Sequence, residues 1–366
     1  MGEKLHNILI LGAGNIGRLI AFLLSQTDDY TVFLADKSID LLELKEVKKN
    51  ASNLQLFTLD ATNEVDLTVF LKENAIHTIL SSLPFFCNVQ VAKVAKKCHL
   101  NYFDLTEDVA TTQAIMALAK DEPRAFVPQC GLAPGFISIV ANELMKQFDT
   151  LDTVKLRVGA LPINSSNALH YCLNWSTDGL INEYGNECEA IIDGKEVKVQ
   201  PLEHLEEIKI DGLTYEAFNT SGGLGTLANT YRERVKNLSY KTIRYPGHCE
   251  KIRFLMNDLK MNQDRTTLKR LLEKSIPKSG QDLILIYVSI TGYKNNKLEE
   301  INYDKKLYPK DFGGLRWSAI QMSTASQICT IVDLITQQPK QYSGFIKQEE
   351  FTLADITNNR FGEYYA

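Results

Sequence analysis

The sequence predicts an α/β fold in which a doubly wound parallel sheet is followed by an α+β domain with a mixed sheet. Up to about residue 127, short apolar segments alternate with amphipathic helical segments, which is the pattern of a parallel sheet covered on both faces. The first apolar segment ends in a glycine-rich turn. Beyond about residue 153 the alternation is lost, and apolar segments follow one another across short turns such as Asp193-Gly194 and Asp211-Gly212, which favour antiparallel pairing.

The first half should contain six strands separated by helices. Short runs rich in branched and aromatic residues predict strands over residues 7–11, 32–35, 54–59, 78–81, 102–105 and 125–127. Apolar residues at helical spacing predict helices over 15–25, 64–73, 89–98 and 109–120. In such a sheet, ligands bind at the carboxyl ends of the strands, so chemistry is expected there.

A domain border is expected at Gly131-Leu-Ala-Pro-Gly-Phe136, where Gly and Pro interrupt the pattern. We assign residues 1–130 to the first domain and 131–319 to the second. The long apolar helix predicted over 319–336 is expected to return residues 320–366 to the first domain. Within the second domain we expect strands over 154–159, 190–192, 196–199, 206–210, 241–245 and 282–292. Helices are predicted over 137–148, 175–184, 248–258 and 266–275.

Composition excludes several classes of protein. The 366 residues suffice for two domains, and the formal net charge of −5 argues against a polyanion such as nucleic acid as the main partner. Apolar runs fall well short of the ~20 residues that span a bilayer. Residues 1–8 lack the pattern of a secretory signal, and the seven cysteines form no Cys-x-x-Cys pair, so neither a disulfide framework nor a zinc ribbon is expected. His248, Cys249 and Glu250 have no second ligand cluster, so we expect no metal site. We therefore expect a cytoplasmic protein with reduced thiols.

The glycine-rich turn has the spacing of a dinucleotide site, and it defines the first domain as a Rossmann domain. Gly12 would make the tight turn, Gly14 would let a pyrophosphate approach the backbone, and Gly17 would let helix and strand pack closely. The intervening Asn15 and Ile16 open the helix, whose free N–H groups and dipole favour phosphate.

Acidic and basic residues after the second strand bear on the choice of cofactor. Asp36 would hydrogen-bond the ribose hydroxyls and favours NAD, whereas the ammonium of Lys37 can meet the 2′-phosphate of NADP, so NAD is expected with NADP as the alternative. Asp60, with Ala61, either reaches the adenine side or forms a turn at the end of the third strand. The fourth strand closes with residues that either line the nicotinamide side or form a structural turn: Ser81, Ser82, Leu83 and Pro84.

Four blocks resemble the saccharopine dehydrogenase family. They are Gly131-Leu-Ala-Pro-Gly135, Val158-Gly-Ala-Leu-Pro162, Tyr215 to Gly223 and Tyr240 to Lys251, and the last three are closest to the lysine 6-dehydrogenase branch. The resemblance covers residues 7 to about 258. It implies a Rossmann domain, a substrate and dimerisation domain with a mixed sheet, and a homodimer. It also implies NAD(P)-dependent oxidation at the amine-bearing carbon of lysine or a lysine-derived amino acid such as saccharopine.

Substrates of that family carry an α-amino-carboxylate, which needs a cationic partner. Arg244 is the leading residue because a guanidinium can bind a carboxylate through two parallel hydrogen bonds, although a structural salt bridge is the alternative. Tyr240 and Trp175 would line the pocket, although a packed structural Trp is the alternative. Hydroxyls and close backbone amides suited to the substrate, or alternatively an ordinary turn, are predicted at Thr220, Ser221, Gly222 and Gly223.

Oxidation of an amine also needs a group that takes the amine proton. Asp104 follows the fifth strand, at the edge of the sheet where chemistry is expected, and His248 has an imidazole that titrates near neutrality. A structural role is the alternative for His248. Two other functions stay open: a reductive condensation like that of carboxynorspermidine or homospermidine synthase, and a non-catalytic NAD(H) sensor.

Overall fold

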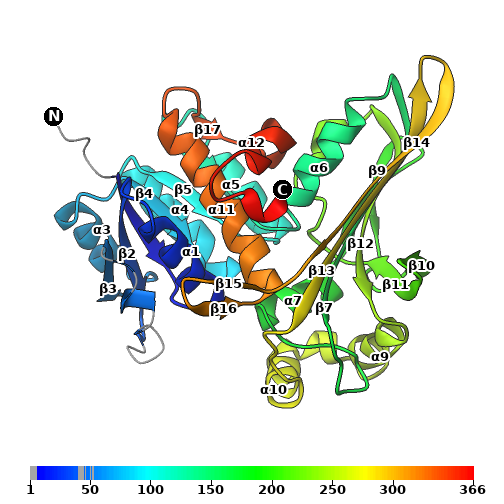
Figure 1. The fold of residues 1–366 in the computed structure, drawn as a ribbon, viewed down its shortest axis with the longest axis horizontal. Helices are drawn as coiled ribbons and strands as arrows, with labels where there is room; N and C mark the ends of the chain where they lie inside the picture. The colour runs from blue at the N-terminus through cyan, green and yellow to red at the C-terminus, as the bar shows by residue number, and fades with distance from the viewer. Residues whose placement is uncertain (1–5, 40–44, 46, 50, 52) are drawn as a thin grey trace. The chain divides into compact units, whose positions relative to one another are not determined.

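The computed structural model describes residues 6–39, 45, 47–49, 51 and 53–366 (Figure 1). The chain divides into two compact units. The first unit comprises Met1–Gly131, Asp311–Leu315 and Gln321–Ala366, and the second comprises Leu132–Lys310 and Arg316–Ile320. The sequence prediction that no signal precedes the first strand rests partly on residues 1–5, which lie outside the described residues.

A seven-stranded sheet in the order β17-β6-β5-β4-β1-β2-β3 forms the centre of the first unit. Every neighbouring pair in this sheet runs parallel. The strands are β1 (His6–Leu11), β2 (Tyr30–Asp36), β3 (Leu54–Thr58), β4 (Thr78–Ser81), β5 (Asn101–Asp104), β6 (Ala125–Val127) and β17 (Gly344–Phe345). This confirms the predicted parallel sheet. The two-residue β17 was not predicted, because so short a segment has no hydrophobic period.

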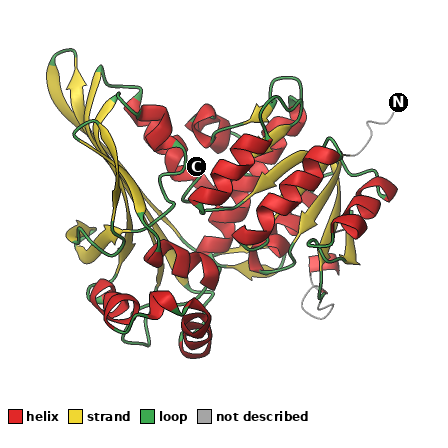
Figure 2. Ribbon diagram, turned by 180° about the vertical axis from the view of Figure 1, so that it is seen from behind, coloured by secondary structure: helices red, strands yellow, loops and turns green. Residues whose placement is uncertain are grey.

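Helices lie against both faces of this sheet, as the two opposite views show (Figures 1 and 2). The helices of this unit are α1 (Asn15–Ser25), α3 (Glu64–Glu73), α4 (Phe85–Lys97), α5 (Val109–Leu118), α11 (Ala319–Gln337) and α12 (Leu353–Thr357). Helix α4 begins four residues earlier than predicted, directly after Pro84, whose φ of −54° suits a helix start. A core cluster that includes Leu9, Ile79, Val91 and Phe126 joins the strands to the helices.

The second unit is built on a mixed sheet in the order β10-β11-β12-β7-β13-β14, and β8 joins it to β9. Strand β12 pairs parallel with β7, whereas β13 pairs antiparallel with both β7 and β14. The strands are β7 (Thr150–Pro162), β8 (Cys188–Ile192), β9 (Lys195–Val199), β10 (Glu206–Ile210), β11 (Leu213–Asn219), β12 (Val235–Arg244), β13 (Asp282–Lys294) and β14 (Lys297–Leu307). The predicted mixed sheet is therefore confirmed.

Strands β11 and β14 were not predicted. Strand β14 has the sequence KLEEINYDKKL and is largely exposed, so no apolar alternation marks it; its length is set by pairing with β13 along eleven register positions from Ile284–Leu307 to Lys294–Lys297. A small hairpin of β15 (Lys310–Phe312) and β16 (Leu315–Trp317) follows it along the chain.

A helical layer of the second unit carries a separate core cluster. The helices of the second unit are α6 (Phe136–Met145), α7 (Thr177–Gly185), α8 (Leu227–Tyr231), α9 (His248–Arg253) and α10 (Arg265–Ser275), and the layer consists of α7, α9 and α10. Residues of α7, α9 and α10 pack with Tyr171 and Phe218 in one buried cluster. The helix predicted over 248–258 is α9 followed by a π-helical turn, Phe254–Asp258. Among the described residues, no helix has the length and apolar character needed to cross a membrane.

Candidate functional site

The glycine-rich turn between β1 and α1 is sterically restricted at two of its three glycines. Gly12 has φ +102°, and a Cβ there would lie 3.0 Å from the carbonyl oxygen of Ser82. A Cβ at Gly17 would lie 1.9 Å from the carbonyl oxygen of Gly12. Strand and helix can approach this closely only because both positions lack a side chain.

Gly14 differs, because a Cβ built there would meet no described atom within 4 Å. It stands at the N-cap of the 11-residue helix α1, and no side chain of a described residue caps the helix there. The first N–H groups of a helix that lacks a side-chain cap attract anions, and the helix dipole adds to this effect. The open space beside Gly14 and these amides therefore fit the pyrophosphate of a dinucleotide.

Asp36, at the end of β2, joins the turn to the next loop. Its Oδ2 accepts a hydrogen bond from the backbone N–H of Ala13 at 2.8 Å, and its Oδ1 accepts one from Ser38 at 3.1 Å. Each carboxylate oxygen has a second lone pair, so Asp36 can still accept a ribose hydroxyl.

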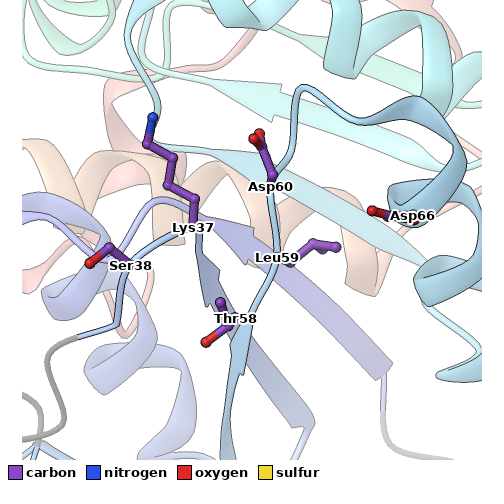
Figure 3. A pocket seen from close by; sticks show the side chains of 6 residues that line it. All are labelled: Lys37, Ser38, Thr58, Leu59, Asp60 and Asp66. Carbon is purple, nitrogen blue, oxygen red and sulfur yellow. The ribbon is translucent and has the colours of Figure 1, made fainter.

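A pocket of about 600 Å³ lies where β2 and β3 end, and it is lined by Lys37, Ser38, Thr58, Leu59, Asp60 and Asp66 (Figure 3). The side chains of Lys37 and Asp60 extend to the same side of it (Figure 3). Hydrogen bonds from Thr62, and more weakly the charge of Lys37, lower the pKa of Asp60. The neighbouring Ala61 is buried in the core cluster of the first unit. The structure thus places Lys37 and Asp60 together at a pocket, and it places Ala61 in the core.

The predicted run from Ser81 to Pro84 borders the turn. The backbone N–H of Ser82 donates to Leu11 at 2.8 Å, and a Cβ on Gly12 would lie 3.4 Å from Leu83. The hydroxyl of Ser81 is buried and donates to Asn88 Oδ1 at 2.7 Å. The segment therefore lies next to the glycine-rich turn, with Ser81 bonded inside the protein.

Asp104 is 0% exposed and its carboxylate is bonded within the first unit. Oδ1 accepts the backbone N–H groups of Thr106 at 2.9 Å and Gln129 at 3.2 Å, and Oδ2 accepts the hydroxyl of Tyr102 at 2.7 Å. Burial raises the pKa of Asp104 to about 6 in spite of these bonds. The pKa suits proton transfer near neutrality, but the side chain has no exposed surface in this structure.

Arg244, at the end of β12 in the second unit, is 2% exposed and has no carboxylate within 4.0 Å among the described residues. Its Nε–H donates to the Tyr184 hydroxyl at 3.0 Å and its Nη1 donates to the carbonyl of Ile243 at 2.9 Å. Its guanidinium carbon lies 5.1 Å from the centroid of the Tyr171 ring. The structural salt bridge considered as an alternative is therefore absent from the part of the chain that the structure describes.

His248 is 0% exposed, and both of its ring nitrogens are engaged. Nδ1 lies 2.7 Å from the carbonyl oxygen of Leu169, and Nε2 lies 3.0 Å from the hydroxyl of Tyr184. Burial, and next the charge of Arg244, lowers the pKa of His248 to about 3. Such an imidazole is too weak a base, and too enclosed, to favour the predicted role in taking the substrate proton.

The other predicted substrate residues lie in the same unit. Thr220 is buried, and its hydroxyl has no hydrogen-bond partner among the described residues. Ser221 donates its N–H to the carbonyl of Glu183, and a Cβ on Gly223 would lie 2.2 Å from the Tyr240 ring. Gly222 has φ +88°, a backbone conformation that favours glycine. Elsewhere in the unit, Trp175 donates its indole N–H to the Tyr171 hydroxyl at 2.9 Å. The segment 220–223 thus joins α7 on one side and Tyr240 on the other.

Sequence reasoning missed Tyr184 and Tyr171, which contact Arg244 directly. Neither stands in a motif, and 60 residues separate Tyr184 from Arg244 along the chain. The fold brings them together through α7 and the loop before it, so the sequence offered no local signal.

Two family models match consecutive parts of the chain. The model of the saccharopine dehydrogenase NADP binding domain matches residues 8–127, and that of the saccharopine dehydrogenase C-terminal domain matches residues 131–363. The chain belongs to the saccharopine dehydrogenase family. The family predicted from the sequence is thereby confirmed, and the first unit is a nicotinamide dinucleotide-binding domain. The closer likeness to the lysine 6-dehydrogenase branch stays a prediction.

Two curated relatives share low sequence identity with the chain. The saccharopine dehydrogenase [NADP(+), L-glutamate-forming] of Saccharomyces cerevisiae is 25% identical over 201 residues, 52% of this chain and 43% of that protein. The mitochondrial alpha-aminoadipic semialdehyde synthase of Rattus norvegicus is 19% identical over 322 residues, 81% of this chain and 33% of that protein. The chain thus spans less than half the length of these two relatives.

A solved structure shares the fold over almost the whole chain. The apo saccharopine dehydrogenase (L-Glu forming) from Saccharomyces cerevisiae aligns with a TM-score of 0.75 at 16% identity, covering 96% of this chain and 95% of that one. At this identity the match establishes the fold, and it agrees with the parallel sheet and mixed sheet described above.

Proposed function

We propose that this chain is an NAD(P)-dependent oxidoreductase that acts at the amine-bearing carbon of saccharopine or lysine. In this proposal the first unit binds the cofactor and the second binds the amino-acid substrate. The buried guanidinium of Arg244 is the observation that supports it most strongly. Saccharopine is the first substrate to test, since the yeast relative carries that name.

The charge of the nearby Glu183 raises the pKa of Arg244, but no carboxylate among the described residues lies within 4.0 Å of its guanidinium. Burying a guanidinium without a direct carboxylate partner is costly, and a bound substrate carboxylate would reduce that cost. The Nη2 atom of Arg244 makes no hydrogen bond to a described residue. Nη1 carries two protons, and the bond to the Ile243 carbonyl uses only one of them, so the other stays available as a donor. These donors can form the parallel pair of bonds that a carboxylate accepts. The buried hydroxyl of Thr220, within the predicted substrate segment, bonds to no residue in the described part of the chain and is a further donor that a polar ligand would satisfy.

The bound nicotinamide would supply hydride transfer at the amine-bearing carbon. The protein's part is to hold the pyrophosphate at Gly14 and the N-terminus of α1, and to hold the adenine-side ribose near Asp36. We propose that NADP is accepted as well as NAD, because Lys37 faces the pocket that adjoins Asp36 (Figure 3). The names of the family model and of the yeast relative both refer to NADP.

Asp104 is our proposed acceptor of the amine proton, since its pKa of about 6 lets it exchange a proton near neutral pH. Its burial means that a change in the loops at Thr106 or Gln129 must expose it during the reaction. For His248 we propose a role in positioning other groups and not in proton transfer.

The test measures NADH or NADPH formation by absorbance, with saccharopine and with L-lysine, and the reverse reaction with an aldehyde, an amino acid and reduced cofactor. Arg244→Met should raise KM for the amino acid by roughly 100-fold while the cofactor Kd stays the same, because a hydrogen-bonded charge is lost from the substrate site alone. Tight cofactor binding without turnover on any of these amines would contradict the proposal and favour a sensor. A homodimer, also proposed, is tested by light scattering on the full chain.

A further inference from the structure

The orientation of Arg244 depends on a residue that no motif includes. Two bonds fix the guanidinium, one from Nε to the Tyr184 hydroxyl and one from Nη1 to the backbone of Ile243. The bond to the Ile243 carbonyl positions only the Nη1 atom of the planar guanidinium. The Tyr184 bond sets the rotation of the plane, and therefore the direction of the donors on Nη2.

The protons of this arrangement can be assigned from donor and acceptor rules alone. An Nε–H group can only donate, so the oxygen of Tyr184 accepts from Arg244 and its own proton must go to another acceptor. His248 Nε2, at 3.0 Å, is that acceptor if it carries no proton. The proton of the ring is then on Nδ1, which donates to the carbonyl of Leu169 at 2.7 Å. One chain of donors thus runs from Arg244 through Tyr184 and His248 to Leu169.

Aromatic rings enclose this chain and exclude water from it. The centroid of the His248 ring lies 5.4 Å from the centroid of the Tyr171 ring and 6.3 Å from that of the Phe218 ring. The planes of the His248 and Phe218 rings are nearly parallel, with an angle of 14° between them. Burial and the nearby Arg244 keep His248 neutral, because its pKa falls to about 3. Hydrogen bonds in series strengthen one another in such surroundings, so a neutral His248 makes the Tyr184 oxygen a better acceptor for Arg244.

We propose that Tyr184 and His248 are positioning residues that hold the guanidinium of Arg244 in the orientation that binds the substrate carboxylate. The inference rests on the proposed function, in which Arg244 contacts that carboxylate. It assigns His248 a fixed neutral state and a role through Tyr184, in place of direct proton transfer.

The first experiment replaces Tyr184→Phe, which removes the hydroxyl and keeps the ring over Arg244. KM for saccharopine should rise roughly 10- to 100-fold with little change in kcat and in the Kd of the cofactor, because the guanidinium loses the bond that orients it and binds the substrate carboxylate less well in the ground state. The matched control is Tyr231→Phe, a buried tyrosine of the same unit whose hydroxyl bonds Asn142 at 2.5 Å. An unchanged KM in folded Tyr184→Phe, or an equal rise in the control, would overturn the proposal.

A second pair of variants separates positioning from packing at His248. His248→Gln keeps an acceptor for the Tyr184 hydroxyl, whereas His248→Phe fills the space without one. KM should rise in the Phe variant and be partly restored in the Gln variant, with thermal unfolding recorded for both. Equal KM values in the two variants would show that His248 acts through packing only.

Nitrogen-15 NMR of histidine-labelled full-length protein tests the arrangement without turnover. His248 should show a protonated Nδ1 and an unprotonated Nε2 from pH 5 to 8, and its Nε2 signal should shift in Tyr184→Phe. A proton on Nε2 contradicts the positioning role, whatever the kinetics show. If His248 has a protonated Nδ1 and an unprotonated Nε2 but the protein turns over no amine, the proposed function is wrong, whereas the hydrogen-bond chain from Arg244 to Leu169 is confirmed.

Discussion

The carboxylate of Asp36 accepts a hydrogen bond from the backbone N–H of Ala13 at 2.8 Å, across 23 residues of sequence. The bond ties the end of β2 to the glycine-rich turn after β1, and the neighbouring bond from Gly12 to the carbonyl of Ala35, also 2.8 Å, reinforces it. Both bonds hold the turn in place before any cofactor arrives. The cofactor site is therefore preorganised, and its residues can be tested one at a time.

Alanine at Gly14 and at Gly17 should have opposite consequences. A Cβ at Gly14 meets no described atom, so Gly14→Ala should fold with nearly the wild-type melting temperature yet bind NAD and NADP poorly, because the methyl group occupies space meant for pyrophosphate. A Cβ at Gly17 collides with the carbonyl of Gly12, so Gly17→Ala should be destabilised by a few kcal/mol. Calorimetric titration and thermal melts distinguish the two. Normal cofactor binding by Gly14→Ala would show that the phosphates lie elsewhere.

Charge changes in the pocket beside Asp36 should alter the choice of cofactor. Lys37→Ala should weaken NADP binding roughly tenfold and leave NAD binding almost unchanged, because the 2′-phosphate loses a cation that remains partly solvated. Asp60→Asn should act in the opposite direction, since it removes a carboxylate whose charge faces that of Lys37. Dissociation constants for both cofactors, measured at one ionic strength, check these signs. An equal loss for NAD and NADP in Lys37→Ala would contradict the assignment.

The raised pKa of Asp104 has a consequence for stability. Its folded-state pKa of about 6 lies above the usual 3.8, so the folded chain holds this proton more tightly than the unfolded chain does. The stabilisation is fully present below pH 3.8 and is lost as the pH rises through 6, by up to about 3 kcal/mol for a shift of this size.

Asp104→Asn removes that dependence. Subtracting its unfolding free energy from that of the wild type should leave a difference that falls between pH 4 and pH 6 and is flat above pH 7. The same variant tests the proposed catalytic role, because the acidic limb of kcat/KM near pH 6 should disappear with it. A difference that is independent of pH would show that Asp104 does not titrate in this range.

The first unit could be predicted well from sequence because local signals determine it. The helix bounds Asn15–Ser25 and Glu64–Glu73 agree with the predicted ranges, since each helix follows a glycine turn or a capping residue such as Asn63 and has apolar residues at helical spacing. Strand β14 was missed because its register is set by pairing with β13, while its own alternating residues are polar and exposed.

The substrate site depends on contacts that spacing cannot show. Arg244 was singled out through the family resemblance. That none of the described carboxylates lies within 4.0 Å of its guanidinium becomes visible only when the surrounding residues are placed. The protonation of His248 likewise depends on contacts that its position in the sequence does not show. Its residue type suggested a base near neutral pH, whereas burial and the adjacent guanidinium lower its pKa and the Tyr184 hydroxyl occupies its free nitrogen.

Asp333, a carboxylate of α11, is 1% exposed. It accepts bonds from the hydroxyl of Tyr30 at 2.6 Å and the amide of Asn359 at 2.7 Å, and it pairs with Arg360 at 2.5 Å. Hydrogen bonds to the Asp333 carboxylate thus link the C-terminal segment to α11 and to β2 of the same unit.

Asp333→Ala leaves the Tyr30 hydroxyl and the side-chain amides of Asn359 and Gln337 without this acceptor. Arg360 keeps its ion pair with Asp29, so the unfolding free energy should fall by about 1 to 3 kcal/mol. Asp333→Asn, which keeps one acceptor, should lose less. Because the loss is local to the segment from Gly344 to the C-terminus, trypsin should cleave at Arg360 faster in Asp333→Ala than in the wild type, before global unfolding. Urea unfolding and timed proteolysis measure the two effects, with Asp355→Ala, a change at the exposed capping residue of α12, as the control. Wild-type cleavage rates in Asp333→Ala would mean that the segment is held by its apolar contacts, such as those of buried Phe351 and Ile356, and not by the carboxylate.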